Sequence, residues 1–326
     1  HVVLFDGDST VFNMTLFANN NLINTQELYY TPNTDKTEIV LGSDSTASLA
    51  FRVYAGDDKY IEHKYTISPE SYIVDFDLNF VGLQEIIPMS TNKIDFSWQI
   101  DVPRQEQGKD WENQNTTIYY KGLNDEVDYL SETSDMKQEE ISAQLKWIAL
   151  KQQFFSSVLI ADTHIIDGKI EYKTLPNSPN YLKHFKANLR LPYNPKQNTT
   201  IDMRLYFGPN KYKVLKNIGA DENLHLQELI PLGWAIFRWV NRFAIIPLFN
   251  FLGSFISNYG LIIFIMTIII KLVLFPLTYK SYLSTAKMRV LKPQIDEINK
   301  KIPKEKAMER QQATMSLYKR AGVNPM

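Results

Sequence analysis

Most of the first 215 residues alternate apolar and polar side chains with a period of two. Such alternation is typical of antiparallel strands that bury one face and expose the other to water. Clusters of Asn, Gly, Pro and Asp separate the runs, as expected for turns. Runs of this kind predict a large β sandwich, and the polar stretch Arg104–Glu140 predicts long loops and exposed strand. The clearest runs are Phe51–Gly56, Ser71–Gly82, Lys93–Val102, Thr116–Gly122, His184–Tyr193 and Thr200–Gly208.

The pattern changes in Leu229–Ser257, where Trp, Phe and Ile are frequent but arginine, asparagine and proline interrupt them. A helix that spans a bilayer needs about 20 mostly apolar residues, so this segment makes a poor span. An amphipathic helix that lies in the membrane interface fits better. A buried helix of the sandwich domain is the alternative. The residues that we expect at the interface are Trp234, Arg238, Trp239 and Arg242.

Tyr259–Leu277 lies in the most apolar part of the chain and predicts a transmembrane helix, with Pro276 near its end. As a helix it would be about 28 Å long, close to the hydrocarbon thickness of a bilayer. Lys271 lies inside it, although a charge at the bilayer centre costs about 2.5–3.5 kcal/mol. We interpret Lys271 as a charge that faces a water-filled groove and attracts polar or acidic segments of another polypeptide. A lysine that snorkels from a tilted helix is the alternative.

The segment after the span predicts two helices that form an antiparallel hairpin. Ser281–Lys301 is the first, Pro303 ends it, and Lys304–Ala321 is the second, with Gly322 as its C-cap. The apolar seam of the first helix is Met288, Leu291, Ile295, Ile298 and Ile302, and Met308 and Met315 lie seven residues apart on the second. The basic residues expected to contact partners are Lys287, Arg289 and Lys292.

The formal net charge of −1 hides a strong segregation of charge. From Thr278 onward there are 11 Lys and Arg residues against 4 Asp and Glu residues, whereas the part before the span is acidic. Basic residues near one end of a membrane span mark the cytoplasmic side, so we expect the β domain outside the cytoplasm. The chain has no cysteine, which favours a bacterial periplasmic domain stabilised by a packed core. Its abrupt ends suggest an internal piece of a longer protein.

Enzymatic and metal chemistry have weak support in the sequence. Leu4–Thr10 resembles the nucleophile loop of haloacid-dehalogenase-type phosphatases, with Asp6 as nucleophile, Asp8 as general acid and Asp57-Asp58 as conceivable Mg²⁺ ligands. That fold needs alternating strands and helices, however, and Asp-Gly-Asp-Ser is also an ordinary turn. The five histidines lack metal-ligand spacing. We therefore expect no catalytic residue and no metal site.

The residues from Gly233 onward closely resemble the YidC family of bacterial membrane protein insertases, part of the wider YidC/Oxa/Alb group. The motifs that carry this resemblance are Gly233-Trp234, Asn258–Gly260, the charged residue at Lys271, Phe275–Thr278, Ala286–Ile295 and Leu317–Pro325. The stretches that resemble the family's periplasmic domain are Val3–Thr10, Lys146–Ala161 and Leu205–Pro209. Arginine is usual in the family at the position of Lys271.

The resemblance implies a periplasmic β-supersandwich similar to galactose mutarotase, followed by an α-helical membrane region and a cytoplasmic hairpin. Further transmembrane helices, which lie outside this chain, would complete a hydrophilic groove open to the cytoplasm and to lipid. The implied function is the insertion and folding of nascent membrane proteins in the bacterial inner membrane, without ATP or another cofactor. The implied partners are the Sec translocon (SecYEG), SecDF, the ribosome and membrane lipids.

The sequence thus predicts four segments and leaves other functions open. The segments are a β-supersandwich at residues 1–228, an interfacial helix at 229–257, a transmembrane helix at 258–279 and a cytoplasmic hairpin at 280–326. A single-span cell-surface receptor with a β-sandwich ectodomain is the main alternative to an insertase and chaperone. A phosphatase is a further alternative.

Overall fold

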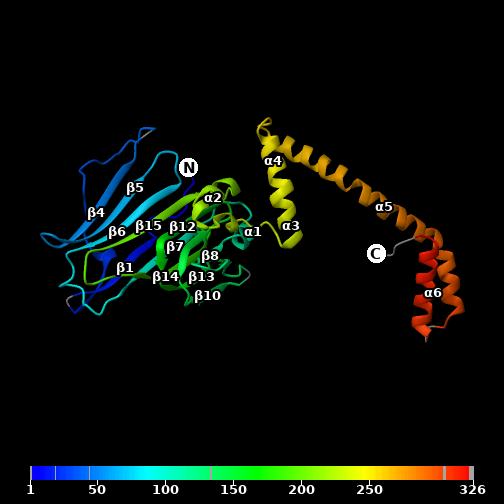
Figure 1. Ribbon diagram of the computed structural model, residues 1–326, viewed down its shortest axis with the longest axis horizontal. Coiled ribbons are helices and arrows are strands. Elements are labelled where there is room, and N and C mark those ends of the chain that lie inside the picture. Colours follow the sequence, from blue (N-terminus) through cyan, green and yellow to red (C-terminus); the bar gives the residue numbers. More distant parts are fainter. Residues whose placement is uncertain (1, 19, 44, 133, 304–305, 323–326) are drawn as a thin grey trace. The chain divides into compact units, whose positions relative to one another are not determined.

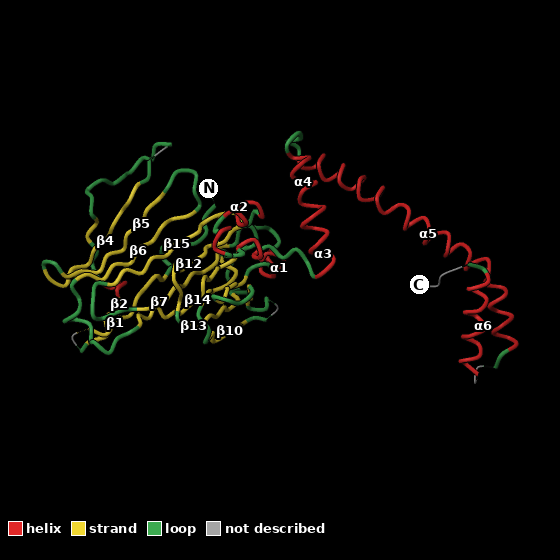
Figure 2. Tube along the Cα trace, viewed as in Figure 1, coloured by secondary structure: helices red, strands yellow, loops and turns green. Residues whose placement is uncertain are grey.

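The computed structural model describes residues 2–18, 20–43, 45–132, 134–303 and 306–322. The chain divides into two units, His1–Pro231 and Leu232–Met326. The first unit is a β sandwich with a few short helices, and the second consists of helices (Figures 1 and 2). The prediction of a mainly β domain followed by an α-helical region is confirmed, whereas the likeness to galactose mutarotase stays a prediction.

The described part of the sandwich contains 15 strands in two sheets, and neighbouring strands are antiparallel throughout. The six-stranded sheet consists, in spatial order, of β10 (Met136–Ile141), β13 (Asp167–Thr174), β14 (Tyr181–Pro192), β7 (Lys93–Pro103), β1 (Val11–Ala18) and β2 (Asn21–Asn24). The nine-stranded sheet consists of β3 (Thr31–Pro32), β4 (Ala47–Gly56), β5 (Lys59–Ile67), β6 (Ile73–Val81), β15 (Thr199–Pro209), β12 (Phe155–Ile165), β11 (Leu145–Lys151), β8 (Thr117–Gly122) and β9 (Val127–Tyr129).

The alternation in the sequence builds the main core between these two sheets. Strand β7 illustrates it, because every second residue is at most 2% exposed while the residues between them are half-buried or exposed. Strand β6 contributes in the same way from the other sheet. The buried residues of these two strands are Ile94, Phe96, Trp98, Ile100 and Val102 of β7 and Phe76, Leu78 and Phe80 of β6.

A second core lies on the outer face of the nine-stranded sheet. There the chain between Tyr212 and Leu229, which contains α2 (Tyr212–Asn217), η2 (Ala220–Glu222) and η3 (Leu226–Leu229), packs against side chains of four strands. Its four leucines reach 0% exposure in this contact. The members are Tyr119, Trp147, Ala149, Val158, Ile160 and Tyr206 of the sheet and Leu215, Leu224, Leu226 and Leu229 of the covering segment.

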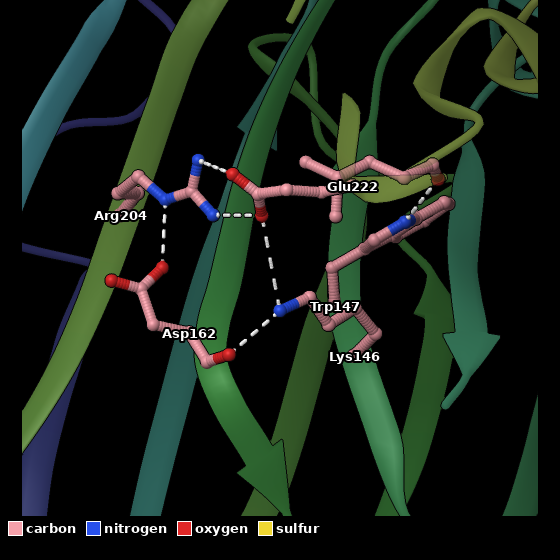
Figure 3. Close-up of polar contacts among 6 residues, drawn as sticks. Lys146, Trp147, Asp162, Arg204 and Glu222 are labelled. Atoms are coloured by element: carbon pink, nitrogen blue, oxygen red, sulfur yellow. Dashed lines mark hydrogen bonds and ion pairs between the residues drawn. The ribbon is translucent and has the colours of Figure 1, made fainter. Parts of the chain in front are cut away.

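Polar contacts hold this covering segment in place (Figure 3). The guanidinium of Arg204 donates two hydrogen bonds to the Glu222 carboxylate, at 3.1 and 2.6 Å, and a third to Asp162 at 2.8 Å. Lys146 donates to the backbone carbonyl of Asp162 at 2.8 Å. Trp147 Nε1 donates to the backbone carbonyl of Leu224 at 2.7 Å. The residues just before the second unit are therefore bound to the sandwich by packing and by hydrogen bonds.

The predicted interfacial helix of Leu229–Ser257 begins later than the sequence indicated. Leu229 belongs to the second core, and the first helix of the second unit, α3, begins at Ala235. Gly233 between them has a φ of +83°, a conformation in which a helix does not continue. The boundary between the two units accordingly follows Pro231 rather than residue 228.

His63 in β5 gives the sandwich a specific sensitivity to acid. Burial lowers the pKa of His63 from 6.5 to about 4, and the ring lies between Tyr30 and Phe76. Between these two pH values the unfolded chain binds a proton that the folded chain does not, so the free energy of unfolding falls as the pH falls from about 6.5 to about 4. At about 1.36 kcal/mol per pKa unit, the loss attributable to His63 is at most about 3 kcal/mol.

We expect His63→Phe, which keeps a ring but cannot be protonated, to reduce this acid dependence. Denaturant unfolding of both proteins between pH 7 and 4 measures it. Parallel pH profiles for the wild type and the variant would assign the dependence to other groups.

The second unit contains five helical elements within its described residues. They are α3 (Ala235–Val240), the π-helix η4 (Asn241–Ile245), α4 (Ile246–Gly253), α5 (Tyr259–Lys301) and α6 (Ala307–Arg320). The predicted span and the predicted first hairpin helix form a single helix of 43 residues, α5. Residues 304–305 and 323–326, which the predicted hairpin included, lie outside the described residues.

Candidate functional site

Helix α5 begins with a side-chain cap and then runs through two prolines. The side chain of Asn258 accepts a hydrogen bond from the backbone N–H of Leu261 at 3.2 Å. Pro276 and Pro293 both lie inside the helix. A backbone that leaves the helix in an apolar environment finds no other hydrogen-bond partners, which favours continuation through Pro276. Among the described helices, α5 is the one long and apolar enough to cross a membrane.

Lys271 lies on α5 with threonines on the same face. Residues four and seven positions apart share one face of a helix, so Thr267 and Thr278 flank Lys271. Each hydroxyl donates to the carbonyl four residues earlier, at 2.8 Å for Thr267 and 2.9 Å for Thr278. These threonines were not predicted as site residues, although their spacing from Lys271 in the sequence was the signal that could have identified them.

The packing within the second unit leaves Lys271 free. Helix α4 packs against the start of α5, where Ile262 is 0% and Met266 8% exposed and the rings of Phe249 and Tyr259 stack at 6.1 Å. Ile262 lies nine residues before Lys271, which is half a turn out of phase at about 100° per residue. Lys271 is exposed, on the side of α5 away from α4.

The four residues predicted at the membrane interface all lie in the segment just before α5. Trp234 precedes α3, Arg238 and Trp239 lie within it, and Arg242 lies in the π-helix. Trp234 is 73% and Trp239 63% exposed. A pair of exposed tryptophans beside two arginines is the composition expected of an interfacial segment. Its place at a membrane interface stays a prediction.

The end of α5 and α6 form a helical hairpin, and the predicted apolar seam of the first helix is half-buried in it. Met288, Leu291, Ile295, Ile298 and Ile302 are half-buried, and α6 packs on α5. The guanidinium of Arg310 on α6 donates to two carbonyls at the end of α5, those of Asn299 at 3.0 Å and Ile302 at 2.7 Å. These bonds satisfy carbonyls that a helix end leaves without partners.

Other residues of the hairpin point to solvent. Met308 and Met315 are 77% and 47% exposed, so they lie outside the contact with α5. The half-buried residues of α6 are instead Arg310, Ala313, Thr314, Leu317 and Tyr318. Lys287, Arg289 and Lys292 are all exposed on α5. The structure does not bring these three residues near Lys271, which is at least 16 residues earlier in the same helix.

The phosphatase-like motif is a closed turn. The carboxylate of Asp6 accepts hydrogen bonds from the backbone and the hydroxyl of Ser9, at 2.8 and 2.7 Å, and from the hydroxyl of Tyr181. These hydrogen bonds, first of all the one from Tyr181, lower the pKa of Asp6. No group of three His, Cys, Asp or Glu residues suitable for a metal occurs in the described part of the chain. The local geometry therefore matches the turn interpretation of this motif.

Comparisons with known proteins cover the whole chain. The family described as "YidC periplasmic domain" matches residues 1–245, and the family described as "60Kd inner membrane protein" matches residues 251–326. The protein of Parabacteroides distasonis named "Membrane protein insertase YidC" is 45% identical over 332 residues, covering 100% of this chain and 51% of that protein. Its namesake from Azobacteroides pseudotrichonymphae is 40% identical, covering 99% and 52%.

A crystal structure of an active YidC insertase aligns with 99% of this chain and 59% of its own chain, at 19% identity and a TM-score of 0.33. The chain spans about half the length of the curated relatives that it matches. One family covers the sandwich and the start of the helical unit, and a second covers the rest. The chain therefore belongs to the YidC family of membrane protein insertases.

Proposed function

We propose that this chain is part of a membrane protein insertase and chaperone, which inserts and folds integral membrane proteins through a hydrophilic groove within the membrane. The observation that carries the proposal is the cation within the apolar N-terminal part of α5. Lys271 lies in the apolar part of the helix, shares a face with two threonines and points away from α4. Ionisable residues inside membrane spans usually face a wet cavity and mark a functional site.

The groove would lower the barrier that a client, the membrane protein being inserted, has to cross. A polar segment of the client must pass hydrocarbon, at a cost of several kcal/mol for each unsatisfied group. A wet groove that reaches partway through the membrane shortens this path, and the ammonium of Lys271 attracts polar or acidic groups of the client into it. The apolar helix of the client then moves sideways into lipid.

The charge distribution supports an orientation in the bacterial inner membrane. The basic residues after Thr278 favour the cytoplasmic side for the hairpin, and the acidic sandwich would lie in the periplasm. Trp234, Arg238, Trp239 and Arg242 would then contact headgroups at the periplasmic surface. The positions of the two units relative to a bilayer are part of this proposal.

The partners that we propose follow from the resemblance of the sequence to the YidC family and from the charge of the hairpin. We propose that the protein acts on nascent membrane proteins, alone or together with the Sec translocon (SecYEG) and SecDF. The exposed Lys287, Arg289 and Lys292 on the hairpin offer positive charge to the ribosome and to anionic lipids. The relatives are named insertases, and we propose that this protein has no catalytic residue and no cofactor.

Reconstitution tests the proposed function directly. The protein in its full length, in proteoliposomes, is expected to insert a ribosome-synthesised client to a greater extent than protein-free liposomes, measured as protease-protected client. A photo-crosslinker at position 271 is expected to capture a stalled client chain. Equal insertion with and without the protein, and no crosslink, would favour the alternative of a single-span receptor with a β-sandwich ectodomain.

A further inference from the structure

Helix α4 contacts the start of α5 through one aromatic stack and a few aliphatic side chains. The ring of Phe249 on α4 stacks on the ring of Tyr259, with centroids 6.1 Å apart and planes at 3° to each other. Gly253 of α4 lies close to Ile262, because a Cβ added to this glycine would be 3.9 Å from Cδ1 of Ile262. Tyr259, Ile262 and Met266 share one face of α5 by their spacing, so this face is the one that packs on α4.

The segment that this contact joins to α5 is a single helical rod. Helices α3, η4 and α4 follow one another without a break from Ala235 to Gly253 (Figure 1), and the backbone at both junctions is helical. We call Ala235–Gly253 the interfacial rod. Ser254–Asn258, which connect the rod to α5, belong to neither helix. A displacement of α5 is therefore transmitted to the rod mainly through the contact around Phe249.

An isolated α5 would not keep Lys271 deep in a bilayer. Lys271 lies about 18 Å along the helix axis from Tyr259 and about 9 Å before Leu277. A slide of α5 towards the cytoplasm by about one turn, about 5 Å, brings the ammonium group nearer to the headgroups. A slide in the opposite direction draws Lys280 into hydrocarbon, which is costly. We therefore expect an unrestrained α5 to settle with Lys271 close to the cytoplasmic surface.

The interfacial rod opposes this slide in the orientation proposed above. Arg238, Trp239 and Arg242 of the rod, and Trp234 just before it, are exposed. Tryptophan is most stable at the level of the headgroups, and an arginine that moves towards the bilayer centre loses its hydration. A rod that is bound to α5 cannot follow α5 into hydrocarbon without moving these four residues there. The contact between α4 and α5 thus holds Lys271 at its depth.

We propose that Phe249 is a positioning residue, which sets the depth of Lys271 in the membrane by stacking on Tyr259 and so binding α5 to the interfacial rod. This inference rests on the proposed insertase function and on the orientation proposed with it. It also gives a physical reason why Lys271 faces a groove and does not snorkel to the cytoplasmic surface.

The test measures the depth of α5 in the full-length protein, reconstituted in proteoliposomes. Leu274, which is 48% exposed, is replaced by a cysteine that carries a nitroxide. Residues 1–326 contain no cysteine, and any cysteine elsewhere in the protein is replaced by serine. Collisions of the nitroxide with oxygen and with a water-soluble nickel complex report its depth. We expect Phe249→Ala to move the label by about 3–5 Å towards the cytoplasmic surface, up to about one helical turn.

Insertion is measured in the same proteoliposomes, without the label. Phe249→Ala is expected to slow the insertion of a client with a charged translocated loop by about threefold, equivalent to about 0.6 kcal/mol. A client with a neutral loop is expected to insert at the wild-type rate, because it depends less on the position of a cation.

Three further variants make the test specific. Phe264→Ala removes the same ring from a position of α5 that is 62% exposed and about 160° from Ile262 around the helix, and it is expected to leave the depth unchanged. Phe249→Tyr keeps the ring and is expected to keep the wild-type depth and insertion. Phe249→Leu removes the ring but stays apolar, and it should shift the label in the same direction as alanine. Circular dichroism shows whether each variant retains its helices.

The outcomes separate this inference from the proposed function. An unchanged label depth in both Phe249→Ala and Phe249→Leu would overturn the role of Phe249, as would an equal shift in Phe264→Ala. A shift without any loss of insertion would show that this depth does not matter for the client. If the wild type inserts neither client better than empty liposomes, the proposed function fails, whereas the depth measurement needs no client and still decides whether Phe249 holds α5.

Discussion

Replacing Lys271 with leucine is expected to slow the insertion of clients with charged translocated segments by about tenfold, equivalent to about 1.4 kcal/mol. The substitution removes the positive charge from the apolar part of α5 and leaves the threonine hydroxyls as the polar groups beside it. Charges interact more strongly in a medium of low dielectric constant than in water, so the loss falls mainly on charged clients. Protease protection of clients that differ in the charge of one translocated loop measures the effect.

Two further variants make this experiment specific. Lys271→Arg keeps the charge and is expected to retain activity, although guanidinium and ammonium groups differ in geometry. Lys280→Leu makes the same change as Lys271→Leu, nine residues later and on the opposite side of the helix. It is expected to leave insertion close to the wild-type rate. Equal insertion by Lys271→Leu and the wild type would argue against a role of this residue in a groove.

Lys271→Leu should also leave folding intact. Lys271 is exposed and α4 packs elsewhere, so the described structure contains no contact that the substitution breaks. Leucine favours a helix at least as well as lysine. A variant that fails to accumulate in the membrane would therefore point to a role of Lys271 in packing.

The strands were predictable because one face of each sheet must be apolar. The run Lys93–Val102 corresponds to β7, Lys93–Pro103, with the predicted alternation between core and solvent. Periodicity identifies the residues that face the core, but it does not show which strands are neighbours. Strand β7 pairs with β14, about 90 residues away in sequence. The pairing uses backbone hydrogen bonds, which do not depend on the identity of the side chains, so the sequence pattern does not reveal it.

The burial of several polar residues was the main feature that the apolar and polar pattern of the sequence did not predict. Strand β8 lies inside the polar stretch Arg104–Glu140, which predicted long loops and exposed strand, yet all six of its residues are buried. Nearby, the ammonium groups of Lys151 and Lys183 donate to the carbonyls of Asn115 and Thr116, at 2.5 and 2.7 Å. Burial lowers the pKa of both lysines to about 8. A sequence pattern assigns lysine to the surface, because it does not show which buried carbonyl an ammonium group will meet.

The sequence predicted which residues of the second unit are helical better than it predicted where one helix ends and the next begins. The seam Met288–Ile302 follows from heptad spacing and is found half-buried. A proline usually ends or kinks a helix, yet α5 continues through Pro276 and Pro293. The sequence thus singled out Lys271 but not the threonines on its face, and the role of Lys271 as a site residue stays a prediction.

The largest effect on stability is expected for Trp147→Ala. Trp147 is 0% exposed in the second core, and its Nε1 donates to the carbonyl of Leu224 at 2.7 Å (Figure 3). Truncation of a buried tryptophan to alanine costs about 3–5 kcal/mol, because packing is lost and a cavity remains. The carbonyl of Leu224 loses its donor in addition. Denaturant unfolding of the sandwich measures the change, with Trp111→Ala, which removes a 65% exposed side chain of α1 (Lys109–Gln114), as the control.

Trp147→Phe separates packing from hydrogen bonding at this position. Phenylalanine keeps most of the apolar volume but cannot donate to Leu224, so it is expected to cost about 1–3 kcal/mol, the range for a buried acceptor left without a partner. Because Leu224 belongs to the segment that leads to the second unit, hydrogen exchange of Tyr212–Leu229 should rise in both variants before the rest of the sandwich opens. Uniform exchange over the whole sandwich would instead mean that this segment and the sheets unfold together, and that the anchor of the helical unit is as stable as the β core.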